Sequence, residues 1–361
     1  MQRPGKEPSS GSGGAGPGRD RTAQGQPPAC AAGGLSHAHT GPSPADPPHG
    51  RNPGPRRYPL TLWRVRTATK INLHLGVGRR AADGYHPVRT VLQAIDFGDE
   101  LVLKPARGEA WTLAVEGSPE IPRGKDNLVH QALKLLRDAA LRRHGRPQAG
   151  IHLSLIKTVP AGGGLGGGSG DAGATLLLVN GALDLGLSHR VLLGIARRLG
   201  ADVPFFLRGG LARGVGRGDR LHSLTPLPAL HVLLAVPPFS LPTAEVYGLF
   251  DRESLTLDGA GFRMRPALGR LRRRNAVPMF WNDLEQHVFR LHTDLADVRD
   301  EMRNGGALVA GLSGSGSTVF GLFAKHPQLS EALEEKDREG WEFHRGRTLD
   351  GCNYLARFRF L

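Results

Sequence analysis

The chain is poor in cysteine and has no long apolar run. Its 361 residues include two cysteines, Cys30 and Cys352, which are too few for a framework of several disulfides. A reducing compartment is therefore the default expectation. No apolar stretch approaches the roughly 18 residues that a membrane-spanning helix needs, so we expect no membrane partner. The length leaves room for two domains.

Aromatic residues are also scarce, and this bears on the excess of positive charge. The formal net charge is +14, whereas aromatic residues make up 6% of the chain. The basic residues are scattered, and the sequence holds neither a zinc-ligand spacing nor an aromatic RNA-binding motif. We expect no nucleic-acid partner. Salt-dependent binding to nucleic acid through the basic charge stays open as an alternative function.

Residues 1–57 have almost no large apolar side chains and are rich in Gly, Pro and Ser. Such a segment cannot bury enough surface to offset the entropy of ordering it, so we expect a disordered tail. It has no apolar core of a secretory signal, which favours a cytoplasmic, bacterial protein. Because the tail carries arginines and few acids, a plastid transit peptide is the alternative.

Glycine is concentrated just after Pro160. Six glycines fall within the seven residues from Gly162 to Gly168, and an apolar segment follows that predicts a buried helix over 169–183. Glycine is favoured where side chains cannot be tolerated, for instance where bare N–H groups surround a phosphate at a helix N-terminus. We interpret this segment as a nucleotide-phosphate loop.

Three other interpretations of the glycine segment are less favoured. A flexible linker rarely runs straight into so apolar a helix. A Walker loop needs a lysine after the last glycine, where this chain has Ser169. A Rossmann fingerprint could use Gly162, Gly164 and Gly167, with Asp184 as ribose ligand. However, Asp184 leads into another predicted helix, where a Rossmann unit needs its second strand.

The hydrophobic patterns predict a mixture of strands and helices without strict alternation, which is typical of an α+β fold. Asn127 and Ser188 are expected to cap helices, and Gly200 to end one. The predicted strands cover 71–77, 91–97, 151–156, 231–236, 307–312 and 317–323. The predicted helices cover 128–141, 169–183, 188–200 and 283–303, and a further helix starts near 243.

Three short segments carry side chains that could do chemistry. In the strand TKINLHLGV, Lys70, Asn72 and His74 share one face and could line a polar cleft, although a half-solvated strand has the same pattern. Asp202, before Pro204, could accept a proton beside the phosphate loop or could simply cap a helix. The segment ADGYH (82–86) could bind a ligand or form a plain hairpin turn.

Taken together, these motifs resemble the GHMP kinase superfamily, and they follow one another in its order and spacing over about residues 62–361. Within it, they resemble the branch that acts on 4-diphosphocytidyl-2-C-methyl-D-erythritol. The matching segments are TKINLHL (69–75), ADGYH (82–86), PAGGGLGGGSGDAG (160–173), GADVPFFLRG (200–209), PTAEVY (242–247), ND (282–283) and LSGSGSTVF (312–320).

The resemblance implies the fold and the reaction. The fold would have two domains with the active site in the cleft between them: a split β-α-β type domain over 58–225 and a ferredoxin-like domain over 226–361. The reaction would be ATP-dependent phosphorylation of the 2-hydroxyl of the cytidylated alcohol, in non-mevalonate isoprenoid biosynthesis. The partners would be ATP, Mg²⁺ and this small molecule, and the protein would be a monomer or homodimer. A kinase for mevalonate, homoserine or galactose is the alternative.

The resemblance also implies roles for single residues. Asp202 would be the general base, and Lys70 would orient it and favour its ionised form. Asn72 would contact the substrate hydroxyls. Tyr85 and His86 would recognise the cytosine end. Further substrate contacts would come from Thr243, Tyr247 (stacked on the cytosine), Gly314 and Gly316. ATP would be held by Lys157, Pro160, Ala161, Gly162, Gly163, Gly164, Leu165, Gly166, Gly167, Gly168, Ser169 and Gly170.

The resemblance implies few protein ligands for the metal ion, and the chain departs from the family pattern at three positions. Mg²⁺ would be carried on the ATP oxygens with few protein ligands, of which the Ser169 hydroxyl is the candidate. Where relatives carry Ser and Ala in the first helical turn, this chain has Gly170 and Gly173, each of which would cost roughly 1 kcal/mol in a helix. Thr69 replaces the usual Ala before the lysine.

Overall fold

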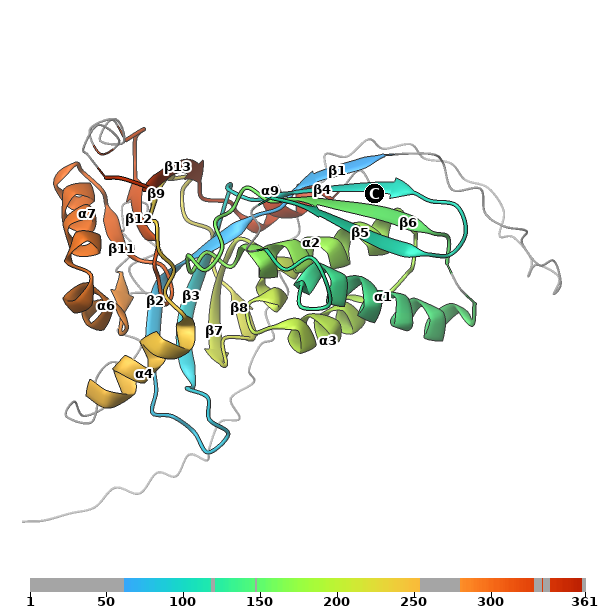
Figure 1. The fold of residues 1–361 in the computed structure, drawn as a ribbon, viewed down its shortest axis with the longest axis horizontal. Helices are drawn as coiled ribbons and strands as arrows, with labels where there is room; N and C mark the ends of the chain where they lie inside the picture. The colour runs from blue at the N-terminus through green and yellow to red at the C-terminus, as the bar shows by residue number, and fades with distance from the viewer. Residues whose placement is uncertain are drawn as a thin grey trace, which may run out of the picture. The chain divides into compact units, whose positions relative to one another are not determined.

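The computed structural model describes residues 62–117, 121–146, 148–253, 280–327, 333 and 338–358. These residues form three mixed or antiparallel sheets with flanking helices, which confirms the α+β class (Figure 1). The predicted tail, 1–57, lies outside the described residues. Among the helices that are described, none is long and apolar enough to cross a membrane.

The first sheet has the order β1-β4-β6-β5 and is covered on one face by α1, α2 and α3 (Figure 1). β5 and β6 are parallel, and the other pairs are antiparallel. The shared core is rich in Leu, Val and Ala from the sheet and all three helices. The elements are β1 (Trp63–Arg66), β4 (Glu100–Pro105), β5 (Trp111–Glu116), β6 (Ile151–Ile156), α1 (Leu128–His144), α2 (Gly167–Ala182) and α3 (His189–Leu199).

The ends of these helices follow the predicted capping signals. Asn127 Oδ1 accepts a hydrogen bond from the N–H of Val129 at 2.8 Å, which fixes the start of α1. Ser188 Oγ accepts from the N–H of Val191 at 3.4 Å, and α3 ends at Gly200. α2 is followed directly by α3. The second strand of a Rossmann unit is therefore missing at this point, as the sequence predicted.

The second sheet has the order β10-β2-β3-β7-β8. β2 is buried along its whole length, so the alternative of a half-solvated strand is wrong. Its Ile71 and Leu73 pack against the third sheet, which leaves the opposite face, with Lys70 and Asn72, for the site. The elements are β2 (Thr69–Val77), β3 (Val88–Ile95), β7 (Leu211–Gly216), β8 (Arg220–Ser223), β10 (Trp281–Asn282) and the short 3₁₀ helix η1 (Val203–Leu207).

The third sheet is antiparallel, with the order β11-β12-β9-β13. The predicted single helix over 283–303 is wrong, because the chain breaks at His292 into α6 and α7. β10 comes from the same C-terminal half of the chain as the third sheet, but it pairs with β2 of the second sheet. The predicted domain boundaries at 58 and 225 stay a prediction. The elements are β9 (His231–Val236), α4 (Thr243–Glu253), α6 (Glu285–Leu291), α7 (Thr293–Asn304), β11 (Val309–Leu312), β12 (Val319–Phe323), β13 (Glu342–Arg347) and α9 (Gly351–Ala356).

The short helix α9 near the C-terminus braces the segment that follows Asp202. Tyr354 is fully buried, and its hydroxyl donates to the carbonyl of Phe206 in η1 at 2.5 Å. Arg357 donates to the carbonyl of Thr67 at 2.7 Å, just before β2.

Close packing explains the two unexpected glycines at the start of α2. A Cβ atom at Gly170 would lie 2.2 Å from the carbonyl oxygen of Ala68, and one at Gly173 would lie 2.5 Å from Cβ of Phe206. Both distances are shorter than any van der Waals contact allows. The helix therefore approaches β2 and η1 more closely than alanine or serine would permit, and the two glycines fix this spacing.

We predict that Gly173→Ala lowers the free energy of unfolding by about 1–3 kcal/mol, because the added methyl group overpacks a filled core. The matched control is Gly194→Ala in α3, where nothing lies within 4 Å of the added Cβ. There, alanine should stabilise by about 0.5–1 kcal/mol. Urea unfolding of both variants checks this, and a stabilised Gly173→Ala protein would contradict the packing argument.

Candidate active site

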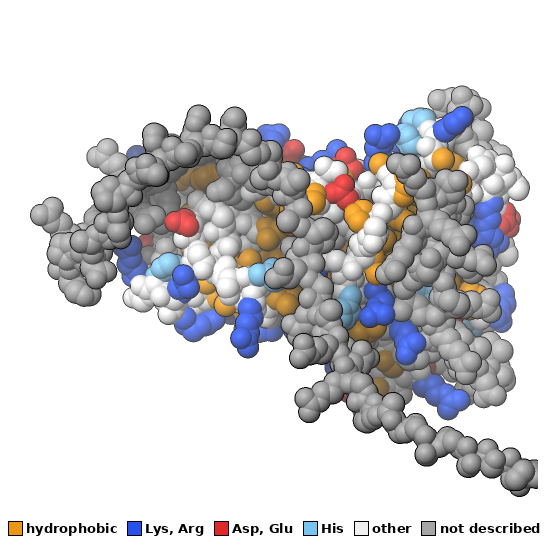
Figure 2. All heavy atoms as spheres, turned by 180° about the vertical axis from the view of Figure 1, so that it is seen from behind, with side chains coloured by type: hydrophobic (Ala, Val, Ile, Leu, Met, Phe, Trp, Pro, Cys, Tyr) orange, Lys and Arg blue, Asp and Glu red, His pale blue; other side chains and the backbone are white. Residues whose placement is uncertain are grey.

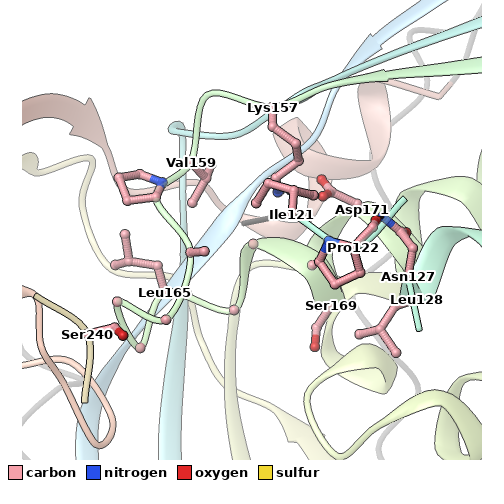
Figure 3. Close-up of a pocket in the computed structure, with 18 of the residues that line it drawn as sticks. Ile121, Pro122, Asn127, Leu128, Lys157, Val159, Leu165, Ser169, Asp171 and Ser240 are labelled. Atoms are coloured by element: carbon pink, nitrogen blue, oxygen red, sulfur yellow. Dashed lines mark hydrogen bonds and ion pairs between the residues drawn. The ribbon is translucent and has the colours of Figure 1, made fainter. Parts of the chain in front are cut away.

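The glycine segment lines a cavity of about 460 Å³ between β6, the start of α2 and the segment before α4 (Figure 3). Every residue implied to hold ATP lines it except Gly170, which packs on Ala68 instead. Sequence reasoning missed an apolar part of the wall, formed by Ile121, Pro122 and Leu128. No motif marks these residues, because an apolar wall shows no pattern that distinguishes it from a core.

The phosphate loop between β6 and α2 is held from the outside by hydrogen bonds to its carbonyl groups. The carbonyl of Gly164 accepts from Lys70 Nζ at 2.7 Å and from Ser313 Oγ at 3.1 Å. The carbonyl of Gly163 accepts from the N–H of Thr318 at 3.2 Å. Gly164 has φ +74°, and a Cβ atom there would lie 2.2 Å from the carbonyl oxygen of Ser313. Glycine is therefore required by both conformation and space.

Lys70 and Asp202 lie together beside this loop. The ammonium Nζ of Lys70 is 3.8 Å from Asp202 Oδ2 and donates to Asn72 Oδ1 at 2.7 Å. Burial lowers the pKa of Lys70, and the negative charge of Asp202 acts against that shift. Asp202 occupies the N-cap position of η1 but makes no capping hydrogen bond. With its side chain 36% exposed, the carboxylate can meet a ligand.

The residues predicted for the cytosine end are only partly brought together. The rings of His86 and Tyr247 are 5.1 Å apart with a 44° tilt, and His86 Nε2 is 3.4 Å from Asp251 Oδ2. Tyr85 is exposed instead, and the guanidinium of Arg217 lies 3.8 Å above its ring. No motif marks Arg217, because a hairpin turn between β7 and β8 brings it to Tyr85.

Burial and neighbouring charge keep the Tyr247 hydroxyl protonated. Burial and, to a smaller extent, the negative charges of Asp202 and Asp283 raise the pKa of Tyr247 to about 12. Tyr247 is therefore a half-buried, neutral aromatic ring.

The loop LSGSGS closes the other side of the site. A Cβ atom at Gly314 would lie 3.2 Å from Lys70 Nζ, whereas one at Gly316 would meet Leu312 and Leu241. Gly314 therefore lies beside the ammonium and Gly316 packs on apolar side chains. Asn282, from the ND motif, donates to the carbonyl of Gly314 at 2.8 Å and fixes the loop. Thr243 Oγ1 is 3.0 Å from Ser315 Oγ, at the edge of the cavity.

Lys157 is bound to two carboxylates behind the phosphate loop. Its ammonium donates to Asp99. It also donates, at 2.8 Å, to Asp171 Oδ2, and the side chains of Lys157 and Asp171 are drawn in Figure 3. Burial acts against the charged form of Lys157, but Asp171 and Asp99 outweigh it and raise its pKa. Burial raises the pKa of Asp171 to about 7, and the positive charge of Lys157 opposes that shift. Sequence reasoning missed both carboxylates, which are 72 residues apart (171 − 99).

We predict that Asp171→Asn changes how stability depends on pH. The ordinary carboxyl pKa is 3.8, so between that value and about 7 the folded protein holds a proton that the unfolded chain has released. The wild-type free energy of unfolding should therefore fall as the pH rises through this range. Asparagine cannot titrate, so the variant should lose this decline. Urea unfolding from about pH 5 to 8 measures it, and an unchanged slope would contradict the assignment.

The site combines a glycine-rich phosphate loop with a carboxylate–ammonium pair. This combination is typical of phosphoryl transfer, which needs positioning and charge neutralisation more than covalent chemistry. Sequence profiles of the GHMP kinases match at residues 127–210 (N terminal domain) and 264–340 (C terminal). The protein is therefore a GHMP kinase.

Relatives of known name define its place within this group. A 4-diphosphocytidyl-2-C-methyl-D-erythritol kinase of Pelotomaculum thermopropionicum is 40% identical over 71% of this chain and 87% of the relative. Another, from Pelobacter propionicus, is 34% identical over 81% and 96%. A crystal structure of 4-(cytidine 5'-diphospho)-2C-methyl-D-erythritol kinase covers 80% of this chain with a TM-score of 0.65 and 34% identity. The chain belongs to the 4-diphosphocytidyl-2-C-methyl-D-erythritol kinase family.

More distant structures share the fold alone. A homoserine kinase from Cytophaga hutchinsonii covers 80% of this chain with a TM-score of 0.56 and 20% identity. A mevalonate kinase from Methanococcus jannaschii covers 81% with a TM-score of 0.54 and 15% identity. The two-domain GHMP kinase architecture implied by the motifs is thereby confirmed.

Proposed function

We propose that the protein transfers the γ-phosphoryl group of ATP to the 2-hydroxyl of 4-diphosphocytidyl-2-C-methyl-D-erythritol, giving the 2-phosphate and ADP in non-mevalonate isoprenoid biosynthesis. The observation that carries the proposal is the Asp202 carboxylate. It lies 3.8 Å from the Lys70 ammonium, which itself is bonded to the phosphate loop at Gly164. The names of the relatives support the choice of alcohol.

In this mechanism Asp202 is the general base. Its carboxylate accepts the proton of the substrate hydroxyl, whose oxygen attacks the γ-phosphorus as the bond to ADP breaks. Lys70 holds Asp202 by charge attraction and presents positive charge toward the transferred group. Its two hydrogen bonds, to Asn72 and to Gly164, hold the ammonium where its charge can act on both Asp202 and the transferred group. Asn72 in turn contacts the substrate hydroxyls.

ATP would lie along the cavity with its phosphates at the start of α2. The exposed N–H groups of the loop and the helix dipole favour negative charge there. The apolar wall of Ile121, Pro122 and Leu128 offers the adenine ring a surface to stack on. The transferred phosphate would then point toward Asp202, because the loop passes close to that carboxylate: a Cβ atom at Gly166 would lie 3.6 Å from Asp202 Oδ2.

The residues at the site fit a magnesium ion carried by ATP. Mg²⁺ keeps several waters and usually takes one or two protein oxygens together with substrate phosphates. Among the described residues, no three His, Cys, Asp or Glu side chains gather to form a protein cage for a metal. The half-buried Ser169 lines the cavity in the first turn of α2, and its hydroxyl is the candidate ligand. The ion would neutralise phosphate charge during transfer.

Tyr247 and His86 would bind the cytosine, Tyr247 by stacking and His86 by hydrogen bonding. Thr243 would help to hold the cytidine part from the edge of the cavity. The guanidinium of Arg217 lies 3.8 Å above the ring of Tyr85. Tyr85 can therefore contact the cytosine only if Arg217 moves off this ring or contacts the cytosine as well.

Other properties stay predictions. They are the cytoplasmic location, the monomeric or homodimeric state, and the lack of a nucleic-acid partner. On the face shown in Figure 2, the Lys and Arg side chains that are described lie in separate places, at the lower left and on the right. Dispersed charge is weak support for nucleic-acid binding.

We predict that Asp202→Asn lowers kcat by about 10²–10⁴-fold, because asparagine cannot accept the hydroxyl proton. ATP binding should change by less than about twofold, since the carboxylate does not hold the nucleotide. ADP release and calorimetric ATP binding check the two statements. Asp300→Asn, which alters an exposed carboxylate on α7, is the control and should leave both unchanged. Full activity of Asp202→Asn would remove the base from the mechanism.

We predict that Tyr247→Ala raises the KM of the cytidylated alcohol by at least about tenfold, because the cytosine loses an aromatic stacking partner. The KM of ATP should change little. Tyr247→Phe keeps the ring and should retain most of the affinity. Equal losses for both substrates in Tyr247→Ala would contradict the stacking role.

The wild-type protein tests the choice of substrate in the same ADP-release assay. Mevalonate, homoserine and galactose lack the cytosine and should give no turnover above background. If one of them were phosphorylated as fast as the cytidylated alcohol, the proposed substrate would be wrong although the protein would still be a GHMP kinase.

A further inference from the structure

A closed ring of hydrogen bonds lies behind the phosphate loop. Asp171 Oδ2 accepts from the ammonium of Lys157, and Asp171 Oδ1 accepts from the hydroxyl of Thr67 at 2.9 Å. The same hydroxyl accepts from the N–H of Asp99 at 2.9 Å. The carboxylate of Asp99 accepts from Lys157 and closes the ring. All four side chains are nearly or fully buried.

This ring joins the two ends of the phosphate loop. At the entry, Asp99 Oδ1 accepts from the backbone N–H groups of Thr158 and Val159, at 2.6 and 2.8 Å. At the exit, Asp171 lies in the first turns of α2. Lys157, the first residue after β6, bridges the two carboxylates. The ring therefore fixes the distance between the strand that leads into the loop and the helix that leads out of it.

We propose that Thr67, Asp99, Lys157 and Asp171 act as a positioning clamp that holds the phosphate loop in its ATP-binding form. The proposal rests on the proposed function in one respect, namely that this loop binds the phosphates of ATP. Lys157 then acts through the loop, because two of its three ammonium hydrogens are already donated to Asp99 and Asp171.

Electrostatics and positioning make opposite predictions for this cluster. Two carboxylates surround one ammonium close to the place where a polyphosphate would bind. Neutralising one carboxylate should tighten ATP binding if charge alone decided the affinity. It would also free Lys157 to contact a phosphate directly. If the clamp decides the affinity, the same substitution must weaken ATP binding because the loop loses its support.

The test compares Asp99→Asn, Asp171→Asn, the double variant and Thr67→Val in the full chain. The dissociation constant of a non-hydrolysable ATP analogue is measured by calorimetry at pH 8, above the pKa of Asp171 of about 7, so that this carboxyl is ionised in the wild type. The kcat and both KM values are measured by ADP release at the same pH. Each single variant should raise the dissociation constant of the analogue and the KM of ATP by about tenfold. The KM of the alcohol and kcat should change by less than about threefold. Because the two carboxylates act through one ring, the loss of analogue affinity in the double variant should be smaller than the product of the losses in the two single variants.

Thr67→Val and one control variant keep the outcome interpretable. Thr67→Val changes no charge and keeps the side-chain volume, so it reports on the ring even if a carboxylate variant does not fold. Asp300→Asn is the matched control: it also removes one carboxylate charge, but Asp300 is exposed on α7 and is paired with Arg299. It should leave analogue binding unchanged.

The possible results separate the two proposals. Unchanged or tighter analogue binding in Asp99→Asn, Asp171→Asn and Thr67→Val, with a wild-type protein that binds normally, would overturn the clamp alone. A wild-type protein that binds no ATP analogue would overturn the proposed function itself.

Discussion

The buried ammonium of Lys70 is the contact on which the site depends. Its side chain is 6% exposed, and an unpaired cation at such a place would cost several kcal/mol. The cation is compensated by Asn72 on its own strand, by the Gly164 carbonyl of the phosphate loop and by Asp202 before η1. Because these partners come from three segments, the same compensation that makes the lysine tolerable also fixes the relative positions of nucleotide loop and carboxylate.

Lys157 is the second buried cation at the loop, and the comparison between the two lysines assigns their roles. The carboxylates that surround Lys157 are 0% and 1% exposed, and both accept hydrogen bonds from its ammonium, although Asp171 also lines the cavity. The carboxylate beside Lys70 is 36% exposed and has no capping bond. The carboxylates around Lys157 are therefore structural support. Asp202, beside Lys70, is an acceptor that is free to take part in the chemistry. Residue type alone would not separate the two, since each is an Asp near a Lys.

Much of the local structure could be predicted from the sequence because it is encoded locally. The caps at Asn127 and Ser188 and the strands of 151–156 and 231–236 follow from neighbouring residues. The break at His292 could not be predicted, because both α6 and α7 continue one apolar period. Asp99 and Arg217 were missed for a similar reason: only the tertiary fold brings them to the loop and to Tyr85.

The glycine segment shows why one sequence signal can have two physical causes. At Gly164, Gly170 and Gly173 a side chain would collide with protein atoms within 2.5 Å, so packing alone requires glycine there. At Gly168 an added Cβ would meet only one atom within 4 Å, a Leu128 methyl carbon 3.9 Å away, although glycine in a helix costs up to about 1 kcal/mol relative to alanine. Packing gives no reason for glycine at that position, and the open space faces the cavity. It is this glycine, rather than the crowded ones, that argues for a ligand at the start of α2.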